Sequence, residues 1–421
     1  MMDFRTLPDG RFTLRNVTVP ACLIGQSGDL IRTDIGVDSG MIAAPEGKEV
    51  DMAGAMVLPC FYDMHTPLDK GHIWPRASNP DGTFMGALTT VRADHANWSA
   101  EDVAARMDFS LRSAFAHGTR AIRTHLDSAE GQYAISWPVL ADMREKWAGR
   151  IDLQASSLAS CEAFSTDGEF RGIANTVAAH DGILGMVTYP VPDLRERLLG
   201  FFDMATQRGL SVDFHVDETM DASSETLRLI ADTVIETGFD APVVVGHCCS
   251  LSTQDEARAM DTLDLVARAG LRVVSLPMCN LYLQDREGSR TPRRRGVTLV
   301  HEMRARGIPV SFASDNTRDP FYAYGDLDML EVLREATRIA HLDHSAADWV
   351  EAFTTTPAES CGFPPASLSE GAPADLVIFR ARSWTELLAR PQSDRIVLRG
   401  GRAIDRTLPD HSELDSIVGA P

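Results

Sequence analysis

Short apolar runs alternate with amphipathic stretches through the middle of the chain. Eight runs of strand length recur there, each bounded by polar or glycine-containing turns. They are residues 56–60, 120–125, 151–155, 183–188, 210–215, 242–247, 271–276 and 308–313. Between them apolar residues return at helical spacing, as in 104–115 and 227–235. Eight strands that alternate with helices predict an α/β fold, a (β/α)8 TIM-like barrel.

Both ends of the chain carry a different pattern, with β-forming residues, glycine punctuation and no useful helical spacing. The β-rich segments are 12–20, 36–42, 374–379 and 395–401. We expect the two ends to join in one small flanking β-sandwich domain. The predicted division is residues 1–57 with 361–421 for that domain, and 58–360 for the barrel.

Composition narrows the possible partners and the compartment. With 421 residues and 44% hydrophobic side chains, the chain can bury a large core, and a net charge of −20 argues against nucleic acid or an anionic membrane as partner. Seven cysteines, an odd number, do not form a disulfide pattern. The first residues lack an apolar signal core, and no run approaches the roughly 20 apolar residues of a membrane span. The expectation is a cytoplasmic protein.

Ionisable residues stand at or just after the carboxyl ends of several predicted strands. They are His65, His125, His215, Glu218, His247 and Asp315. Barrel enzymes carry their active sites at this end of the strands, so the fold would bring these distant residues together. Three or four histidine and carboxylate ligands with one position open to water make a catalytic site for zinc or iron.

The chemistry of such a site suggests roles for the remaining groups. A metal lowers the pKa of bound water, and Asp315 or His247 can orient or deprotonate that water. Glu218, three residues after His215, is placed to pass a proton to a leaving nitrogen.

Each residue also admits a simpler interpretation. His65 or His247 alone fits a buried structural histidine, and Asp315 alone fits a turn or a helix cap. Phe321 can stack on a flat ring or fill the core beside Pro320. Because all the polar residues fall at the same end of a repeating unit, we favour the metal site.

Several motifs then resemble a known family. Residues 58–65 (LPCFYDMH), 215–218 (HVDE), 246–247 (GH), 314–315 (SD) and 371–378 (GAPADLVI) are similar to the amidohydrolase superfamily. Residues 68–70 (LDK) and 123–127 (RTHLD) resemble cytosine deaminase and N-isopropylammelide amidohydrolase more closely. Residues 277–286 and 292–298 resemble cytosine deaminase in particular, and 315–321 fits both.

The resemblance covers nearly the whole chain and implies an activity and a site. It implies hydrolysis of an exocyclic C–N bond in a small nitrogen heterocycle, with release of ammonia or an amine, by a homo-oligomeric enzyme with one divalent zinc or iron ion. The residues it implies are His65, His215 and Asp315 for the metal, Glu218, His247 and Asp315 for catalysis, and Ser160, Gln284, Phe321 and His125 for the substrate.

Two departures from the family pattern change these expectations. The family's His-x-His reads His65-Thr66-Pro67 here, so proline stands where a metal ligand is expected. Ser160 stands where cytosine deaminases carry a substrate-reading glutamine, so we expect a substrate other than cytosine. The alternative prediction is a catalytically silent barrel that lost its metal with the second histidine. Hydrolysis of a cyclic amide is a third possibility, but the position of Glu218 favours deamination.

Overall fold

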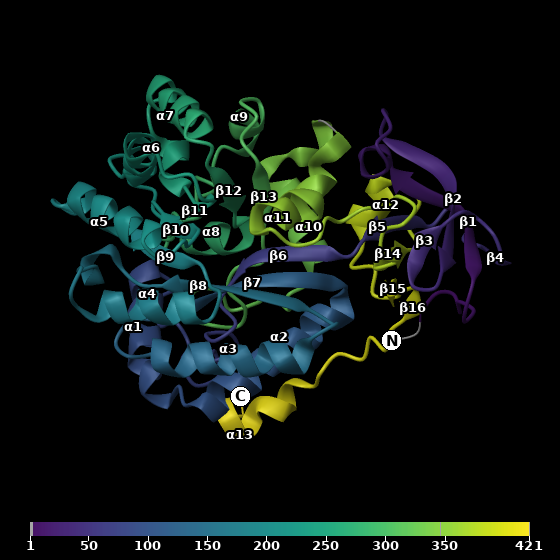
Figure 1. Ribbon diagram of the computed structural model, residues 1–421, viewed down its shortest axis with the longest axis horizontal. Coiled ribbons are helices and arrows are strands. Elements are labelled where there is room, and N and C mark those ends of the chain that lie inside the picture. The colour runs from purple at the N-terminus through teal and green to yellow at the C-terminus, as the bar shows by residue number, and fades with distance from the viewer. Residues whose placement is uncertain (1–2, 346, 421) are drawn as a thin grey trace.

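The computed structural model describes residues 3–345 and 347–420, and its central body is a ring of eight parallel strands (Figure 1). The strands are β6 (Phe61–Thr66), β7 (Thr119–Asp127), β8 (Asp152–Leu158), β9 (Leu184–Thr188), β10 (Val212–Val216), β11 (Val243–His247), β12 (Arg272–Ser275) and β13 (Val310–Phe312). Hydrogen bonds link β6 to β8 in one sheet and β9 to β13 in another. Bridges at Ser156–Ile183 and Ser160–Val187 join β8 to β9, and the Asp315 N–H donates to the His65 carbonyl at 2.9 Å beside β6. The α/β barrel fold is confirmed.

Helices surround this ring or lie in the loops at its ends. They are α1 (Phe84–Asp94), α2 (Ala100–His117), α3 (Tyr133–Trp147), α4 (Glu169–Ala179), α5 (Leu194–Thr206), α6 (Thr226–Thr237), α7 (Glu256–Arg268), α8 (Pro277–Leu283), α9 (Val300–Arg304), α10 (Met329–Ala340) and α11 (Thr355–Cys361). Strand alternation decides which side chains meet them: Phe214 of β10 packs its ring 5.0 Å from that of Phe201 on α5. Its neighbours Asp213 and His215 therefore point to the barrel interior. Among the described helices, none combines the length and apolar character needed to cross a membrane.

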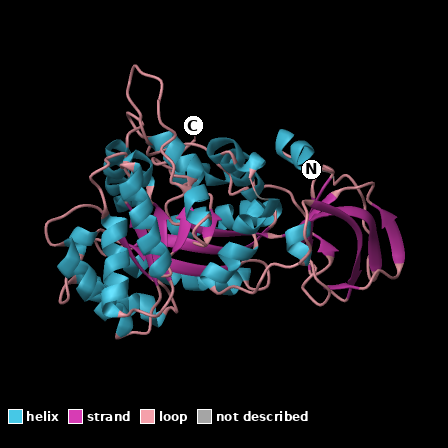
Figure 2. Ribbon diagram, turned by 90° about the horizontal axis from the view of Figure 1, so that it is seen from above, coloured by secondary structure: helices cyan, strands magenta, loops and turns pink. Residues whose placement is uncertain are grey.

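A second sheet flanks the barrel (Figure 2), and it contains strands from both ends of the chain (Figure 1). Its strands are β1 (Phe12–Pro20), β2 (Leu30–Asp38), β3 (Met41–Ala43), β4 (Lys48–Asp51), β5 (Met56–Pro59), β14 (Leu376–Phe379), β15 (Ile396–Arg399) and β16 (Arg402–Ala403). Helix α12 (Trp384–Ala389) belongs to the same part of the chain. Hydrogen bonds link the eight strands in one continuous sheet, and the predicted flanking β-domain with strands from both chain ends is confirmed. Strand β1 changes register between Leu14 and Val17, and Asn16 has φ +56°, so β1 pairs with β4 before this irregularity and with β5 after it.

The structure corrects the position of the first barrel strand. The other seven predicted strands are confirmed as β7–β13, but the run at 56–60 forms β5, which pairs with β14 in the flanking sheet. The barrel starts at Phe61, and the chain passes between the sheets at Cys60. Since both β5 and β6 are completely buried, their apolar pattern continues from one strand to the next without a polar break.

Two segments bear on the predicted division of the chain, which stays a proposal. Strand β5 extends the flanking sheet slightly beyond residue 57. The C-terminal helix α13 (Asp415–Val418) instead lies against α2, where Leu414 and Val418 pack with Phe109 (Figure 1). We therefore propose that the last residues of the chain belong structurally with the barrel.

A buried ion pair ties the flanking sheet to the barrel. The Arg395 guanidinium, just before β15, donates to both carboxylate oxygens of Asp328 at 2.7 Å, and Asp328 caps the first turn of α10. Nearby, Gly118 ends α2 with φ +98°, and a Cβ at this position would lie 2.6 Å from a methyl group of Val377 on β14. Glycine therefore meets both the backbone and the packing requirement at this junction.

Candidate metal and catalytic site at the barrel mouth

Two histidines, one from each sheet of the barrel, meet in its interior. His65 of β6 is buried and His215 of β10 is half-buried, and their Nε2 atoms are 3.0 Å apart. Gly246 of β11 pairs with His215, and a Cβ on Gly246 would lie 3.0 Å from Cε1 of His65. Glycine in β11 thus leaves the space that the His65 ring fills.

A second set of polar groups lies at the ends of β10, β11 and β12. Nδ1 of His247 is 3.4 Å from Oε1 of Glu218. The Asn280 side-chain amide, on α8 just after β12, donates to Glu218 Oε1 at 3.3 Å and lies 3.0 Å from His247 Nδ1. Gln284, one turn later on the chain, donates to the Glu218 carbonyl at 3.1 Å. The two α8-region amides therefore hold both the main chain and the carboxylate of Glu218.

Backbone strain accompanies the functional side chains. Asp217, His247 and Asp315 have φ of +47°, +67° and +61°, a left-handed conformation that non-glycine residues rarely adopt. The carboxylate of Asp217 stabilises the turn before Glu218 because it accepts bonds from the backbone N–H groups of Thr226 and Leu227 at the start of α6. Such strain is typical of functional sites, where surrounding contacts hold the backbone in place.

Asp315 is held at the mouth through its main chain. Its N–H donates to the His65 carbonyl, and its carbonyl accepts the Thr66 hydroxyl at 2.8 Å. Its Oδ1 lies 3.9 Å from His65 Nε2, while its buried Oδ2 has no hydrogen-bond partner among the described residues. One oxygen of this buried carboxylate is thus left without a hydrogen-bond partner among the described residues.

Burial lowers the pKa values of the imidazoles and raises those of the carboxyls. Burial lowers the pKa of His65 and His215 far below the usual range, and that of His247 to about 3. Burial and the nearby Asp315 raise the pKa of Glu218 strongly. Burial also raises the pKa of Asp315 to about 7. Neutral imidazole is the form that binds metal, and a carboxyl with a raised pKa can carry a proton.

Three groups of side chains in the described residues have the spacing of metal ligands. They are His65–His215–His247, His65–His125–Asp213 and Glu218–His247–Asp315. Within them, His65 Nδ1, His247 Nε2 and Asp315 Oδ2 are buried atoms without hydrogen-bond partners in the described chain. Nitrogen and oxygen donors in this arrangement fit a divalent cation such as zinc or iron.

His125 lies in the barrel interior, against His65 and Asp213. It comes from β7, its ring centroid is 3.8 Å from that of His65, and its Nε2 is 3.3 Å from Asp213 Oδ1. Arg123 also contacts Asp213, at 2.9 Å. The structure therefore places His125 against His65 and this buried ion pair, and its substrate-binding role stays a prediction.

Ser160 takes part in a hydroxyl chain that the sequence did not indicate. Its Oγ is 2.7 Å from the Tyr189 hydroxyl, which donates to the Glu162 carboxylate at 2.9 Å. Ser160 follows β8 and Tyr189 follows β9, so both stand at the strand ends. This partly exposed group can present a hydroxyl to a ligand.

Phe321 lies beside two groups of the mouth. It packs edge-on against Phe84, with centroids 5.4 Å apart, and the Lys70 ammonium lies 5.1 Å from its ring centroid. The ammonium nitrogen of Lys70 is also 3.2 Å from Asp127 Oδ1. Sequence reasoning did not identify Lys70, Asp127 and Asn280 as site residues, although all three stand inside motifs that carry the family resemblance.

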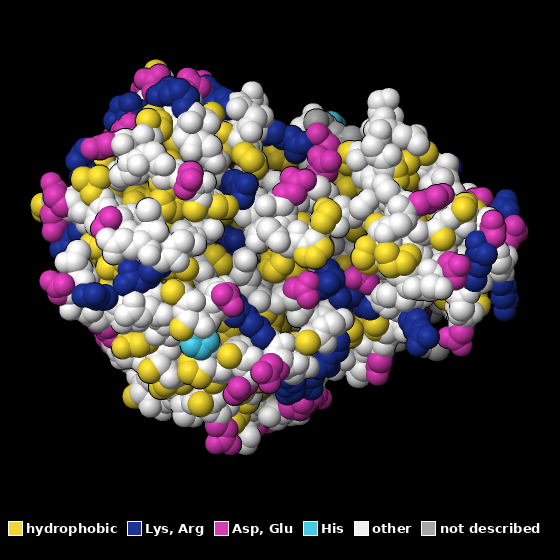
Figure 3. Space-filling view, viewed as in Figure 1, with side chains coloured by type: hydrophobic (Ala, Val, Ile, Leu, Met, Phe, Trp, Pro, Cys, Tyr) yellow, Lys and Arg dark blue, Asp and Glu magenta, His cyan; other side chains and the backbone are white. Residues whose placement is uncertain are grey.

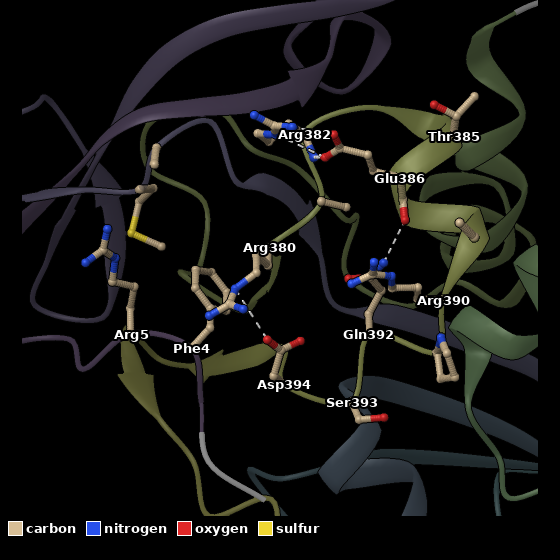
Figure 4. Close-up of a pocket in the computed structure, with 15 residues that line it drawn as sticks. Phe4, Arg5, Arg380, Arg382, Thr385, Glu386, Arg390, Gln392, Ser393 and Asp394 are labelled. Carbon is tan, nitrogen blue, oxygen red and sulfur yellow. Dashed lines mark hydrogen bonds and ion pairs between the residues drawn. The ribbon is translucent and has the colours of Figure 1, made fainter.

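A separate cavity of about 1020 Å³ lies in the flanking domain and contains none of the predicted site residues. Figure 4 shows four arginines around it, Arg5, Arg380, Arg382 and Arg390. Two of them are paired: Arg380 lies 3.5 Å from Asp394, and Arg382 lies 2.6 Å from Glu386. On the face shown in Figure 3, acidic and basic side chains are interspersed.

Comparison with known proteins places the chain among hydrolases with this architecture. Residues 165–404 match the Amidohydrolase family. The chain is 52% identical to pterin deaminase from Rhizobium rhizogenes (strain K84), over 97% of each chain. Its fold is similar to that of 5-methylcytosine deaminase from Klebsiella pneumoniae liganded with 5-fluorocytosine (TM-score 0.81, 23% identity, 95% of this chain and 98% of that one). It is also similar to N-isopropylammelide isopropylaminohydrolase from Burkholderia multivorans (TM-score 0.75, 25% identity, 94% and 98%).

Proposed function

The chain belongs to the amidohydrolase family, and from this premise we propose that it is a pterin deaminase. It is a hydrolase that acts on a C–N bond of a cyclic amidine. In the proposed reaction water adds to the ring carbon that carries the amino group, the bond to the amino nitrogen breaks, and the 2,4-dioxopteridine and ammonia leave. The observation that carries the proposal is the 52% identity with a pterin deaminase along nearly the full length of both chains.

For the metal we propose His65, His215 and Asp315 as ligands of one zinc or iron ion. Their closest atoms lie 3.0 Å apart for the histidine pair and 3.9 Å apart for His65 and Asp315, which is compatible with donors around one small cation. Pro67 offers no donor, which leaves three protein ligands, the number typical of open catalytic zinc sites. When bound, such an ion supplies Lewis acidity that makes water a nucleophile near neutral pH.

Glu218 and Asp315 divide the proton transfers. Asp315 takes the proton of the attacking water on its free carboxylate oxygen, which a pKa of about 7 allows. Glu218 gives its proton to the ring nitrogen, because its raised pKa keeps it protonated in the resting site. The proton that Asp315 took then passes through Glu218 to the departing amine, and the hydroxyl proton of the adduct returns to Glu218 as the ring carbonyl forms. Burial and proximity of the two carboxyls favour one shared proton over two charges.

His247 is proposed to stabilise the oxygen that adds to the ring. The Asn280 amide N–H faces His247 Nδ1, so Nδ1 accepts and the proton of the neutral ring sits on Nε2. That Nε2 is buried without a partner among the described residues, which leaves its N–H for an oxygen of the reacting group.

We propose that the substrate is a ring system larger than cytosine. Ser160 is short, and it contacts Tyr189 rather than filling the space of a glutamine side chain. We propose that this space takes the second ring of a pteridine, with Phe321 against its face and Gln284 supporting Glu218 from the other side.

Pro67 favours one alternative, a silent barrel that binds a ligand without metal. Metal analysis separates the two readings: the wild-type protein and Asp315→Ala are compared by elemental mass spectrometry. Our proposal expects near one zinc or iron per wild-type chain, loss in the variant, and ammonia release from pterin by the wild type alone. A wild-type protein that takes up no metal from excess zinc or iron supports the silent barrel. Homo-oligomeric assembly remains a proposal that rests on the resemblance, and a cytoplasmic location remains one that rests on the sequence composition.

A further inference from the structure

Lys70 is an unusual residue in this chain. Of the 40 lysines and arginines in the sequence, three are lysines: Lys48, Lys70 and Lys146. Lys70 is the buried one, with 5% of its surface exposed. It follows β6 by four residues, in the loop that also contains Pro67. A chain that uses arginine for most of its cations thus has a compact ammonium at the barrel mouth.

The ammonium of Lys70 has one charged partner within direct contact among the described residues. Its nitrogen lies 3.2 Å from Asp127 Oδ1, and Asp127 also lies 3.2 Å from His95 Nε2. On another side, the face of Phe321 covers the ammonium at 5.1 Å. An ammonium has three N–H donors and no acceptor, so contact with Asp127 leaves donors for a further oxygen.

Lys70 also lies near the groups proposed to move protons. Its positive charge works to lower the pKa of both Glu218 and Asp315, against the effect of burial. The ammonium itself stays charged because Asp127, Asp319 and Asp69 raise its pKa more than burial lowers it. A buried cation therefore lies over the ring of Phe321 and acts electrostatically on the two catalytic carboxyls.

We propose that Lys70 Nζ donates a hydrogen bond to a carbonyl oxygen of the substrate ring, so that the enzyme selects 2-amino-4-oxo heterocycles over 2,4-diamino ones. This inference rests on the proposed deaminase function and names a specificity-determining residue for it. The carbonyl oxygen accepts the ammonium N–H, whereas an amino group at the same position presents donors and leaves the buried cation unpaired.

The same contact acts on the reaction. When water adds to the amino-bearing carbon, electron density moves through the adjacent ring nitrogen onto the carbonyl oxygen. A fixed cation at that oxygen is bound more strongly in the transition state than in the ground state, which accelerates the reaction. Arginine at this position would be larger and planar, which explains why lysine fits the space between Asp127 and Phe321.

The test compares the metal-loaded wild-type enzyme with Lys70→Met on two substrate pairs. The pairs are pterin with 2,4-diaminopteridine, and 2-amino-4-oxopyrimidine with 2,4-diaminopyrimidine. We expect the wild type to prefer the oxo member of a pair about 100-fold in kcat/KM. Lys70→Met should lose about 100-fold on the oxo substrate and change little on the diamino substrate.

Two measurements keep a structural effect apart from a specificity effect. Metal content should match the wild type and circular dichroism should show a folded protein, although loss of the cation beside Asp127 lowers the thermal unfolding midpoint. The dissociation constant of 2,4-dioxopteridine, followed by its fluorescence, should rise at least tenfold in Lys70→Met. Lys146→Met is the matched control, because Lys146 is exposed on α3 and contacts Asp108. If Lys70→Met does not fold, Lys70→Met with Asp127→Asn takes its place, since this pair leaves no unpaired carboxylate.

The outcomes separate this inference from the proposed function. Equal loss on the oxo and diamino substrates, no oxo preference in the wild type, or unchanged binding of the dioxo ring overturns the role of Lys70. A wild-type enzyme inactive on pterin overturns the proposed function instead, and the oxo preference is then judged on the pyrimidine pair and on ligand binding. Loss of metal from Lys70→Met would assign Lys70 to support of the ligands and would also overturn the inference.

Discussion

Two clusters of buried ionisable side chains differ in how many of their polar atoms have hydrogen-bond partners. At the junction of barrel and flanking sheet, Arg395 donates to both oxygens of Asp328 and also to the carbonyls of Pro391 and Gln392. At the barrel mouth, by contrast, buried atoms of His65, His247 and Asp315 have no hydrogen-bond partner in the described residues.

The pKa shifts follow the same division. Burial works to raise the pKa of Asp328, but Arg395 and His117 outweigh it, so that pKa lies far below its usual value. At the mouth burial prevails, and the pKa of Asp315 rises to about 7. A buried ionisable group with all its hydrogen-bond and ion-pair partners in place stabilises one structure. A buried group that lacks partners can bind a cation, a substrate or a proton. Breaking each cluster should therefore affect different properties.

The largest effect is expected from Glu218→Gln. The amide keeps the shape and the neighbours of Glu218 but cannot transfer a proton, so kcat should fall at least about 10³-fold. Metal content and the thermal unfolding midpoint should stay close to wild type. Steady-state deamination assays with elemental analysis check this, and turnover within tenfold of wild type would remove Glu218 from the mechanism.

The next largest effect is on stability, from Arg395→Met. This change leaves the Asp328 carboxylate buried without its cation, so the free energy of unfolding should fall by about 3–5 kcal/mol. The kcat of the protein that remains folded should not change, because Arg395 lies at the domain junction. Denaturant titration measures the loss, and Arg402→Met on the exposed edge strand β16 is the control. A loss below about 1 kcal/mol, as in an exposed pair, would show that the junction does not depend on this contact.

The smallest effect is expected on the pH dependence of the free energy of unfolding. The pKa of Asp328 is lower in the folded than in the unfolded chain, so its ionisation stabilises the fold above the unfolded pKa of about 3.9, and this contribution is lost as pH falls toward the folded pKa. Between pH 5 and 3 the wild type should therefore lose on the order of 1 kcal/mol more unfolding free energy than Asp328→Asn. Equal pH slopes for the two proteins would contradict this.

Much of the fold could be predicted because it depends on local patterns. Strand alternation and helical spacing predicted the barrel and seven of its strands, and Phe214 against His215 shows how that alternation separates helix-facing from interior side chains. The pattern failed at β5, where two buried strands follow one another and only their pairing partners tell them apart.

The chemistry of the site divides in the same way. The sequence by itself determined which ionisable residues end the strands and that Pro67 removes one potential ligand. Residue type and position along a repeat can both be read from the linear sequence. Only the tertiary structure decided that Asn280 orients His247, that His125 lies behind His65, and that Lys70 faces Phe321 and Asp127. Such contacts join segments far apart in the chain, and their geometry follows from barrel closure and loop packing, which no local pattern records.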